Sequence, residues 1–298
     1  MTLIQFIEQA VDVKLKQVQA NDIYLPENTL CFQLRDDEIQ ALSIRDTDLA
    51  NIPDEIFRLT SLEILFLAQN KLGTVSDQLG ELVNLTHLFL YSNQLAELPY
   101  ALSNLSKLMT LDLANNQLST MPDNLDRLHA LRYLYLHNNR FDRVPESIFA
   151  LPDLTYLNLS ENHLTILPEM IGHLDGLIEL RLLENYLTSL PNSISGLSNL
   201  NELHLRKNQL SQLPDTIGEL SALRVLNVRD NQLVSLPDSI GQLEQLHTLD
   251  LRSNRLRTLP DTIVNLPNLI RLDLRWNPIA TMPTWIADLE ARDCVVYR

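Results

Sequence analysis

The chain has 298 residues, of which 45% are apolar and 20% are charged, and its formal net charge is −15. The apolar content excludes a disordered acidic protein, and the lack of an apolar run of about 18 residues predicts no transmembrane helix. The negative charge argues against binding to nucleic acid or to an anionic membrane. With only seven glycines, the chain is also poor in the residue that phosphate-binding loops need.

The cysteine count and the first residues indicate a reducing compartment. Cys31 and Cys294 are too few for the disulfide framework of a small secreted domain. The first residues carry no basic leader, and Glu8 and Asp12 interrupt the apolar stretch, so the segment is unlike a secretory signal. We therefore expect a cytoplasmic protein.

The N-terminal segment predicts an amphipathic helix over residues 2–20. Thr2 and Gln5 have the spacing of a capping box, and apolar residues recur at steps of three and four, at Ile4, Ile7, Val11, Leu15 and Val18. The polar face mixes both charges, which favours packing on the chain that follows over a partner-binding or membrane role. Together with a strand predicted over 29–34, residues 1–38 are expected to form an N-terminal cap.

A repeat of 23 residues dominates the chain from 39 to 291. Asparagine recurs on this step at ten positions, and proline recurs on the same step with one gap at Ser76. The consensus reads LxxLxLxxNxLxx-apolar-PxxIxxLxx. Seven of its positions are apolar in all eleven repeats, which is 77 of 77 sites. Such a pattern predicts supersecondary units that stack on one another to bury a shared core.

Each part of the consensus predicts a structural role. Positions 3 to 6 alternate in polarity, so each repeat supplies a short strand to a parallel sheet. The amide of the asparagine at position 9 both donates and accepts, and we expect it to satisfy backbone groups of a buried turn. The proline at position 15 suits the first turn of a short helix. An acidic residue follows it in eight repeats, where negative charge favours a helix N-terminus.

These residues and their spacing resemble the leucine-rich repeat family, in the 23-residue form of intracellular Ras-group and bacterial proteins. The resemblance covers about 85% of the chain. It implies an α/β solenoid curved like a horseshoe, with a parallel sheet on its concave face and short helical or 3-10 segments on its convex face. It further implies protein binding on the concave face and no enzyme activity by itself.

The chain departs from the repeat at both ends, as the caps of a solenoid do. The first repeat has Thr47 at the asparagine position. Residues 292–298 predict a closing half-repeat, with Cys294–Tyr297 in strand register. We expect Trp285 and Ile286 to shield the last core layer. The two cysteines would then lie at opposite ends of the array, too far apart for a disulfide.

Consensus positions 3, 5 and 7 are predicted to project onto the concave face, with positions 8 and 10 at its edge. In repeats two to six these positions are almost uncharged and form an aromatic zone of Phe66, Phe89, Tyr91, Tyr133, Tyr135, His137 and Tyr156. Exposed aromatic side chains are enriched in binding hot spots. We therefore favour a partner-binding role over stacking that merely stabilises the sheet.

Repeats seven to eleven carry an arginine column at position 7, formed by Arg206, Arg229, Arg252 and Arg275. Arg181 and Arg271 join this zone, and Trp276 lies at its edge. With eight bases and six acids, the zone has a net charge of +2. Arginine suits bidentate recognition of carboxylate or phosphate groups. Asp250 and Asp273 are equally placed to neutralise the column, and the sequence leaves both interpretations open.

We expect no enzyme, no cofactor and no metal site. His137, Glu161, His163 and Glu184 come from adjacent repeats, but the chain lacks the short Cys/His spacing of zinc sites. Neither cysteine has a histidine beside it in the predicted layout, and no Walker loop, kinase motif or nucleophile elbow is present. Because only residues 292–298 follow the repeats, we expect no appended catalytic domain.

The sequence thus predicts a monomeric, non-catalytic scaffold for a partner protein. The aromatic zone would anchor the partner, and the arginine column would orient an acidic patch on it. Family resemblance implies a small GTPase or a signalling enzyme as the kind of partner. Two alternatives stay open. The Tyr/His cluster, with Asn158 alongside, suits a glycan or a small ligand, and the chain also suits a secreted bacterial effector that binds a host protein.

Overall fold

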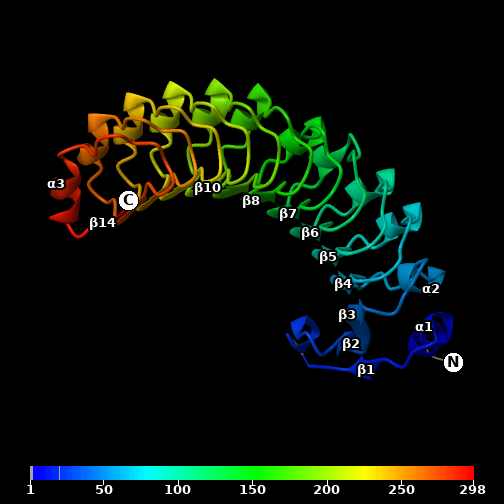
Figure 1. Cartoon of the computed structure of the whole chain (residues 1–298). Helices are drawn as coiled ribbons and strands as arrows, with labels where there is room; N and C mark the ends of the chain where they lie inside the picture. Colours follow the sequence, from blue (N-terminus) through cyan, green and yellow to red (C-terminus); the bar gives the residue numbers. More distant parts are fainter. Residues whose placement is uncertain (1–2, 20) are drawn as a thin grey trace. The chain divides into compact units, whose positions relative to one another are not determined.

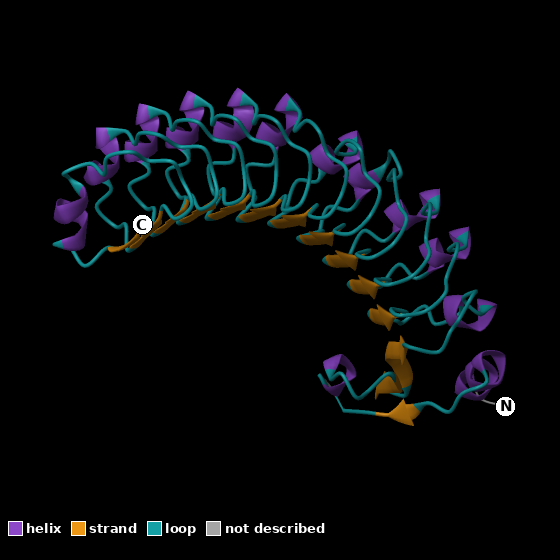
Figure 2. Cartoon of the chain, in the orientation of Figure 1, coloured by secondary structure: helices purple, strands orange, loops and turns teal. Residues whose placement is uncertain are grey.

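The computed structural model describes residues 3–19 and 21–298, so the predicted capping role of Thr2 lies outside the described residues. The chain divides into two compact units. The N-terminal unit comprises residues 1–140 and 145–153, and the C-terminal unit comprises residues 141–144 and 154–298. Within each unit the strands line one side and the short helices line the other, except for the 3-10 helix Asp22–Tyr24, which lies on the side lined by the strands (Figures 1 and 2).

The N-terminal unit contains a sheet whose strands follow one another in chain order. Strands β3 to β7 are parallel neighbours, β2 is antiparallel to β3, and β1 is parallel to β2. The antiparallel pair joins the N-terminal cap to the first repeat, and the strands of the repeats themselves are parallel as predicted. With η denoting a 3-10 helix, the elements are α1 (Leu3–Val11), β1 (Lys16–Gln17), η1 (Asp22–Tyr24), β2 (Leu30–Arg35), β3 (Glu38–Ile44), α2 (Asp54–Phe57), β4 (Ile64–Phe66), η2 (Asp77–Glu81), β5 (His87–Phe89), η3 (Tyr100–Asn104), β6 (Thr110–Asp112), η4 (Leu125–Arg127), β7 (Tyr133–Tyr135) and η5 (Glu146–Ala150).

The C-terminal unit continues the same alternation of strand and short helix. Strands β8 to β14 are all parallel, and each pairs with the next in the sequence. The elements are β8 (Tyr156–Asn158), η6 (Glu169–His173), β9 (Glu179–Arg181), η7 (Asn192–Gly196), β10 (Glu202–His204), η8 (Asp215–Glu219), β11 (Val225–Asn227), η9 (Asp238–Gln242), β12 (Thr248–Asp250), η10 (Asp261–Asn265), β13 (Arg271–Asp273), α3 (Ile286–Glu290) and β14 (Val295–Tyr297). Among the described residues, no helix has the length and apolar character needed to cross a membrane.

The predicted helix over 2–20 was too long, because α1 ends at Val11. The chain turns at Asp12, whose φ is 53°, and the Glu8 carboxylate then accepts hydrogen bonds from the Leu15 backbone N–H and the Lys14 ammonium, both at 2.9 Å. This carboxylate holds the turn, so Lys16–Gln17 pairs as β1 instead of continuing the helix. The predicted strand over 29–34 is present as β2, shifted by one residue.

The core consists of the consensus leucines and their equivalents. All but five of the 77 apolar consensus side chains are buried, and four of the five exceptions lie in the first and last repeats. Removal of so much apolar surface from water is the main stabilising contribution to the fold, at about 25 cal/mol per Å². At the C-terminal end, Trp285 and Ile286 are buried as predicted, and Trp285 Nε1 donates to Asp261 at 2.9 Å.

The repeat asparagines form the hydrogen-bonded ladder that the sequence predicted. Asn208 is representative: its Oδ1 accepts from the backbone N–H of Leu187 at 3.0 Å, and its Nδ2 donates to the carbonyls of Leu182 and Leu205. All ten repeat asparagines accept in the same way from the residue 21 positions earlier. Each amide therefore satisfies backbone groups of the preceding repeat that would otherwise be buried without a partner.

The repeat prolines immediately precede the 3-10 helices, whereas the sequence predicted them in the first turn of each helix. Pro214 precedes η8 with an extended backbone (φ −69°, ψ 152°), and the acidic residue after it, Asp215, is the first residue of the 3-10 helix. The same arrangement recurs at Pro145, Pro168, Pro237 and Pro260. Proline suits this extended position because its φ is fixed near −65°, and the carboxylate then lies at the positive end of the helix.

Candidate binding surfaces on the two sheets

The first part of the predicted aromatic zone is buried under the N-terminal cap. Tyr24 packs edge-on against Phe66 with 5.5 Å between ring centroids, and Phe66 stacks on Phe89 at 4.1 Å. The Arg45 guanidinium lies 4.9 Å from the centroid of Phe66. Phe66 is consequently only 4% exposed. The expectation that Phe66 is exposed on this face is wrong, because the sequence did not indicate that the cap segment at Tyr24 covers it.

The other aromatic side chains differ in their exposure. Tyr133 on β7 is 42% exposed, whereas the remaining ones are half-buried, namely Phe89, Tyr91, Tyr135 and His137 in the N-terminal unit and Tyr156 in the C-terminal unit. Tyr133 thus offers more ring surface to a partner than the other members of the zone.

One acidic residue lies among these rings and escaped the sequence analysis. Asp112 on β6 pairs in register with Phe89 on one side and with Tyr135 on the other. Burial raises the pKa of Asp112 to about 6, against the opposing effect of a hydrogen bond from the Ala114 N–H. A carboxyl flanked by two rings loses hydration, which disfavours its charged form. The sequence feature that could have indicated Asp112 was its place as a single acid at position 5 of an otherwise uncharged zone.

The arginine column in the C-terminal unit is paired with acidic residues of the same sheet. Each of the six predicted arginines has an ion pair, as follows: Arg181 with Glu179, Arg206 and Arg229 with Asp230, Arg252 with Asp250 and Asp273, and Arg271 and Arg275 with Asp273. Of the two interpretations that the sequence left open, internal pairing is therefore present in the structure.

Asp273 is the centre of this charge network. Its side chain is 0% exposed, and its carboxylate lies 2.7 Å from Arg275, 3.3 Å from Arg252 and 3.6 Å from Arg271. Burial opposes ionisation, but the hydrogen bond from Arg275 and the charge of Arg252 outweigh it and hold the pKa of Asp273 below its ordinary value. The carboxylate thereby fixes three guanidinium groups in place.

Trp276 stands out at the edge of the same sheet. It is 66% exposed, and it has a φ of 61°. The guanidinium groups of Arg229 and Arg275 lie 5.9 and 5.8 Å from its ring, within the range of a cation–π contact. A bulky residue in the left-handed region is a genuine outlier. At this point of the consensus, the other repeats from the second to the tenth have shorter or polar residues, such as Ser253, with the same backbone.

Tyr297 on β14 extends this edge and was missed by the sequence analysis. Its ring lies 5.1 Å from the guanidinium of Arg271 and 4.8 Å from that of Arg275. Arg275 thus contacts both Trp276 and Tyr297. We name the surface formed by Trp276, Tyr297 and the arginines that contact their rings the Trp276 patch. The sequence feature that could have indicated Tyr297 was an aromatic residue in the strand register of the closing half-repeat.

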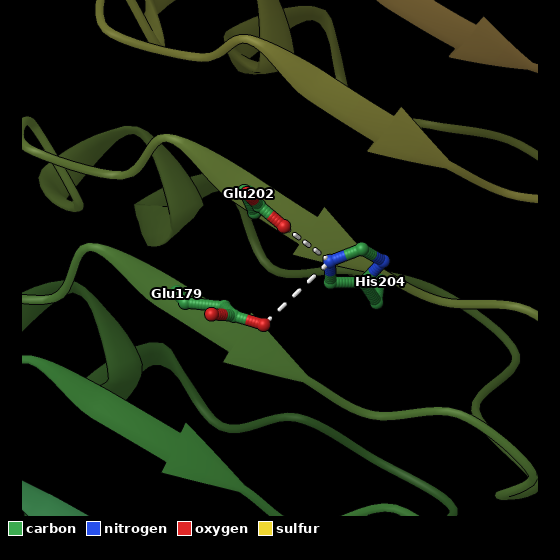
Figure 3. A group of neighbouring side chains, drawn as sticks. All are labelled: Glu179, Glu202 and His204. Carbon is green, nitrogen blue, oxygen red and sulfur yellow. Dashed lines mark hydrogen bonds and ion pairs between the residues drawn. The ribbon is translucent and has the colours of Figure 1, made fainter.

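On β10, four strands before β14 in the C-terminal unit, a histidine lies between two carboxylates. His204 Nε2 is 2.9 Å from Glu202 Oε2 and 3.8 Å from Glu179 Oε1. Figure 3 shows the three side chains pointing toward one another from β9 and β10. Of the four residues considered for a metal in the sequence, Glu184 instead pairs with Lys207 at 2.8 Å, and His163 stacks with Tyr186.

The two cysteines offer no activated nucleophile. Both are buried free thiols, and burial raises the pKa of each. A raised pKa lowers the fraction of thiolate, which is the nucleophilic form.

Comparison with known proteins places these surfaces in a family context. Family models match residues 120–212 and 206–291 ("Leucine-rich repeat region"), 37–95 ("Leucine rich repeat") and 107–128 ("Leucine Rich Repeat"). A search of curated protein sequences found no match to the chain.

Several solved structures resemble the chain. A leucine-rich repeat protein of Leptospira interrogans is 32% identical, with a TM-score of 0.66, over 87% of this chain and 78% of that one. The ectodomain of the Arabidopsis thaliana receptor kinase GASSHO1/SCHENGEN3 is 28% identical, with a TM-score of 0.75, over 95% of this chain and 36% of that one. An internalin, InlF, of Listeria monocytogenes shares the fold at 24% identity and a TM-score of 0.56, over 87% and 86% of the two chains. The repeat, the fold and these matches together establish that the chain belongs to the leucine-rich repeat family.

Proposed function

We propose that this protein is a non-catalytic scaffold that binds a partner protein or peptide, with the Trp276 patch as the main anchor. The observation that carries the proposal is Trp276 itself. Its large apolar ring is exposed to solvent on a backbone conformation that disfavours bulky side chains. Neither its burial nor its backbone preference accounts for tryptophan at this position, whereas tryptophan is strongly enriched in binding hot spots.

The surroundings of Trp276 suit a partner with an apolar anchor and acidic flanks. The guanidinium groups of Arg229 and Arg275 both contact the indole, and ion pairs with Asp230 and Asp273 in turn hold these two groups. Such an arrangement reduces the ordering that the site must undergo when a partner binds. Because these arginines are already paired, an acidic partner would have to share them. We therefore assign the main part of the affinity to the aromatic rings and an orienting role to the charges.

The comparisons support binding of a protein or peptide in general terms. The structure of the GASSHO1/SCHENGEN3 ectodomain contains Casparian strip integrity factor 2. Two further proteins with the same fold, the plant peptide hormone receptor RGFR1 and PEPR1, were solved with RGF2 and with AtPEP1. The latter two are at most 25% identical to this chain. The proposal also includes a small GTPase, a signalling enzyme or a host protein as the partner, a cytoplasmic location and a monomeric state.

The structure argues against the glycan alternative at one of the residues that was expected to bind a sugar, Asn158. Asn158 is buried, and its Oδ1 accepts from the Ser160 N–H at 3.0 Å. Its amide therefore serves the local backbone and has little surface to offer a sugar hydroxyl. We prefer the protein-binding hypothesis for this reason.

Affinity capture from the native lysate tests the proposal. The intact chain, Trp276→Ala and a control variant, Tyr100→Ala, would be used as baits in parallel. Tyr100 is 64% exposed and begins η3, on the side of the N-terminal unit away from the strands, so it matches Trp276 in exposure but not in place. We expect a partner that Tyr100→Ala retains and Trp276→Ala binds at least about thirtyfold more weakly, as for a hot spot of about 2 kcal/mol. Equal capture by all three baits would refute the Trp276 patch as the anchor.

A further inference from the structure

The cluster of Glu179, Glu202 and His204 presents three metal-binding atoms to one point in space. One oxygen of each carboxylate and one imidazole nitrogen all lie within 4.8 Å of one another, which no other group of three or more His, Cys, Asp or Glu achieves among residues 3–19 and 21–298. Figure 3 shows that the side chains converge from two neighbouring strands, with the imidazole aimed at both carboxylates.

The separations of these atoms match those of ligands around a bound transition metal. Ligands at about 2.0–2.1 Å from Zn²⁺ in tetrahedral geometry lie about 3.3 Å apart. The observed distances from His204 Nε2 are 2.9 Å to Glu202 and 3.8 Å to Glu179, one on either side of this value. A movement of about half an ångström in each glutamate would therefore bring its oxygen to a coordinating separation from His204 Nε2.

The fold explains why these side chains meet. Glu202 and His204 are two residues apart on β10, so strand alternation places both on the same face of the sheet. Glu179 on β9 is the register partner of Glu202. The backbone thus fixes the positions of all three residues, and the His204 side chain is only 15% exposed. A site built on adjacent strands is more precise than one built on loops.

Arg181 completes the surroundings of the cluster. It lies two residues after Glu179 on the same face, is the register partner of His204, and donates from Nε to Glu179 Oε1. An outer hydrogen bond of this kind orients a metal-ligating carboxylate. With His204 neutral, the two carboxylates and one guanidinium give a local net charge of −1, which suits a divalent cation.

We propose that Glu179, Glu202 and His204 bind a divalent transition-metal ion of the Zn²⁺ class on the sheet of the C-terminal unit. The imidazole distinguishes this ligand set from the all-oxygen sites that Ca²⁺ and Mg²⁺ prefer. Three protein ligands leave at least one coordination position open toward solvent on the exposed side of the sheet. Water fills that position, or a carboxylate or imidazole of a molecule bound to this face.

Calorimetric titration with ZnCl₂ tests the proposal on the full chain after dialysis against a chelator. We expect one ion per chain. His204→Ala and Glu202→Gln are each expected to weaken binding at least about tenfold, the lower end of the effect even of outer-shell changes. His247→Ala serves as the matched control, because His247 is a half-buried histidine of the same unit and lies outside the cluster. It is expected to leave the affinity unchanged.

A second measurement guards against misfolding of a variant and against binding to scattered surface histidines. Co²⁺ titrated into the wild type should give visible absorption bands of low coordination number, and Glu202→Gln should lose them while its circular dichroism matches the wild type. No binding by the wild type, or equal Zn²⁺ binding by the wild type and His204→Ala, would overturn the proposal.

Discussion

Replacement of Asp112 by asparagine should stabilise the protein at neutral pH and remove a dependence of stability on pH. Folding raises the pKa of Asp112 from an ordinary value of 3.8 to about 6. The folded state therefore holds the proton more tightly than the unfolded chain does, and ionisation of Asp112 above pH 6 destabilises the fold. A difference of about 2 pKa units corresponds to about 3 kcal/mol, which is an upper value because Asp112 is only partly buried.

We expect Asp112→Asn to increase the free energy of unfolding by about 1–3 kcal/mol at pH 7–8. The advantage should shrink as the pH falls from 6 towards 4, where the wild-type carboxyl is itself neutral. Asparagine keeps an Oδ1 acceptor for the Ala114 N–H, so the local hydrogen bond is preserved. The effect therefore isolates the charge of the side chain from its shape.

Urea denaturation followed by circular dichroism between pH 4 and pH 8 measures this difference. Asp126→Asn is the control, because Asp126 is an exposed acid of the same unit, and its difference from wild type should be small and flat across the range. A difference for Asp112→Asn that does not change with pH, or a variant less stable than wild type at pH 8, would refute the reasoning that burial between two rings raises this pKa.

Three further predictions concern stability. Asp273→Asn should cost about 3–5 kcal/mol in urea denaturation, because it leaves guanidinium groups around a buried position without their carboxylate. Asp230→Asn, at a half-exposed pair, should cost at most about 1 kcal/mol. Equal costs for the two variants would contradict the role of Asp273 as the buried centre of the network. Since folding lowers the pKa of Asp273, the stability that its carboxylate contributes should be present above pH 3.8 and vanish at more acidic pH. Asn208→Ala should lower the free energy of unfolding by about 3 kcal/mol, because it leaves one buried N–H and two carbonyls unsatisfied. Replacement of the exposed Asn192 by alanine should be near neutral, and thermal unfolding compares the two variants. Tyr24→Ala should uncover Phe66 and speed hydrogen exchange in β2 and β4, while Tyr186→Ala, in the other unit, should leave those strands unchanged.

The repeat made most of the fold predictable, because its period is tied to a physical requirement at each position. Leucine recurs where the core needs it, and Asn208 and its equivalents recur where buried backbone groups need a partner. The N-terminal segment has no such redundancy. Its apolar spacing predicted a helix to residue 20. In the structure the Glu8 carboxylate accepts a hydrogen bond from the Leu15 N–H after the helix has ended at Val11, and no local sequence pattern indicates this bond.

The binding surfaces were only partly predictable, because side-chain contacts between distant residues decide them. The consensus placed Phe66 on the correct face, but its burial depends on Tyr24, 42 residues earlier in the chain. Likewise the sequence offered Asp250 and Asp273 as partners for the arginine column, whereas the contact between Arg252 and Asp273 required the register of β12 and β13. His204 and its two glutamates lacked the short spacing of known metal motifs, because the third ligand comes from the preceding strand.

The asparagine ladder gives the array a direction. Every repeat amide reaches back to the repeat before it, as Asn208 does to Leu182 and Leu187, and none of these bonds reaches forward. Shortening the chain from its C-terminal end thus strips a partner from backbone groups that stay in the interior. Shortening it from the other end removes the acceptors of the asparagine amide, and it also removes carbonyl partners of backbone N–H groups, such as that of Leu187 for the Gln209 N–H. Deletions from the two ends should therefore break different sets of bonds, and a truncated version of this protein should extend past the asparagine that serves its last complete repeat.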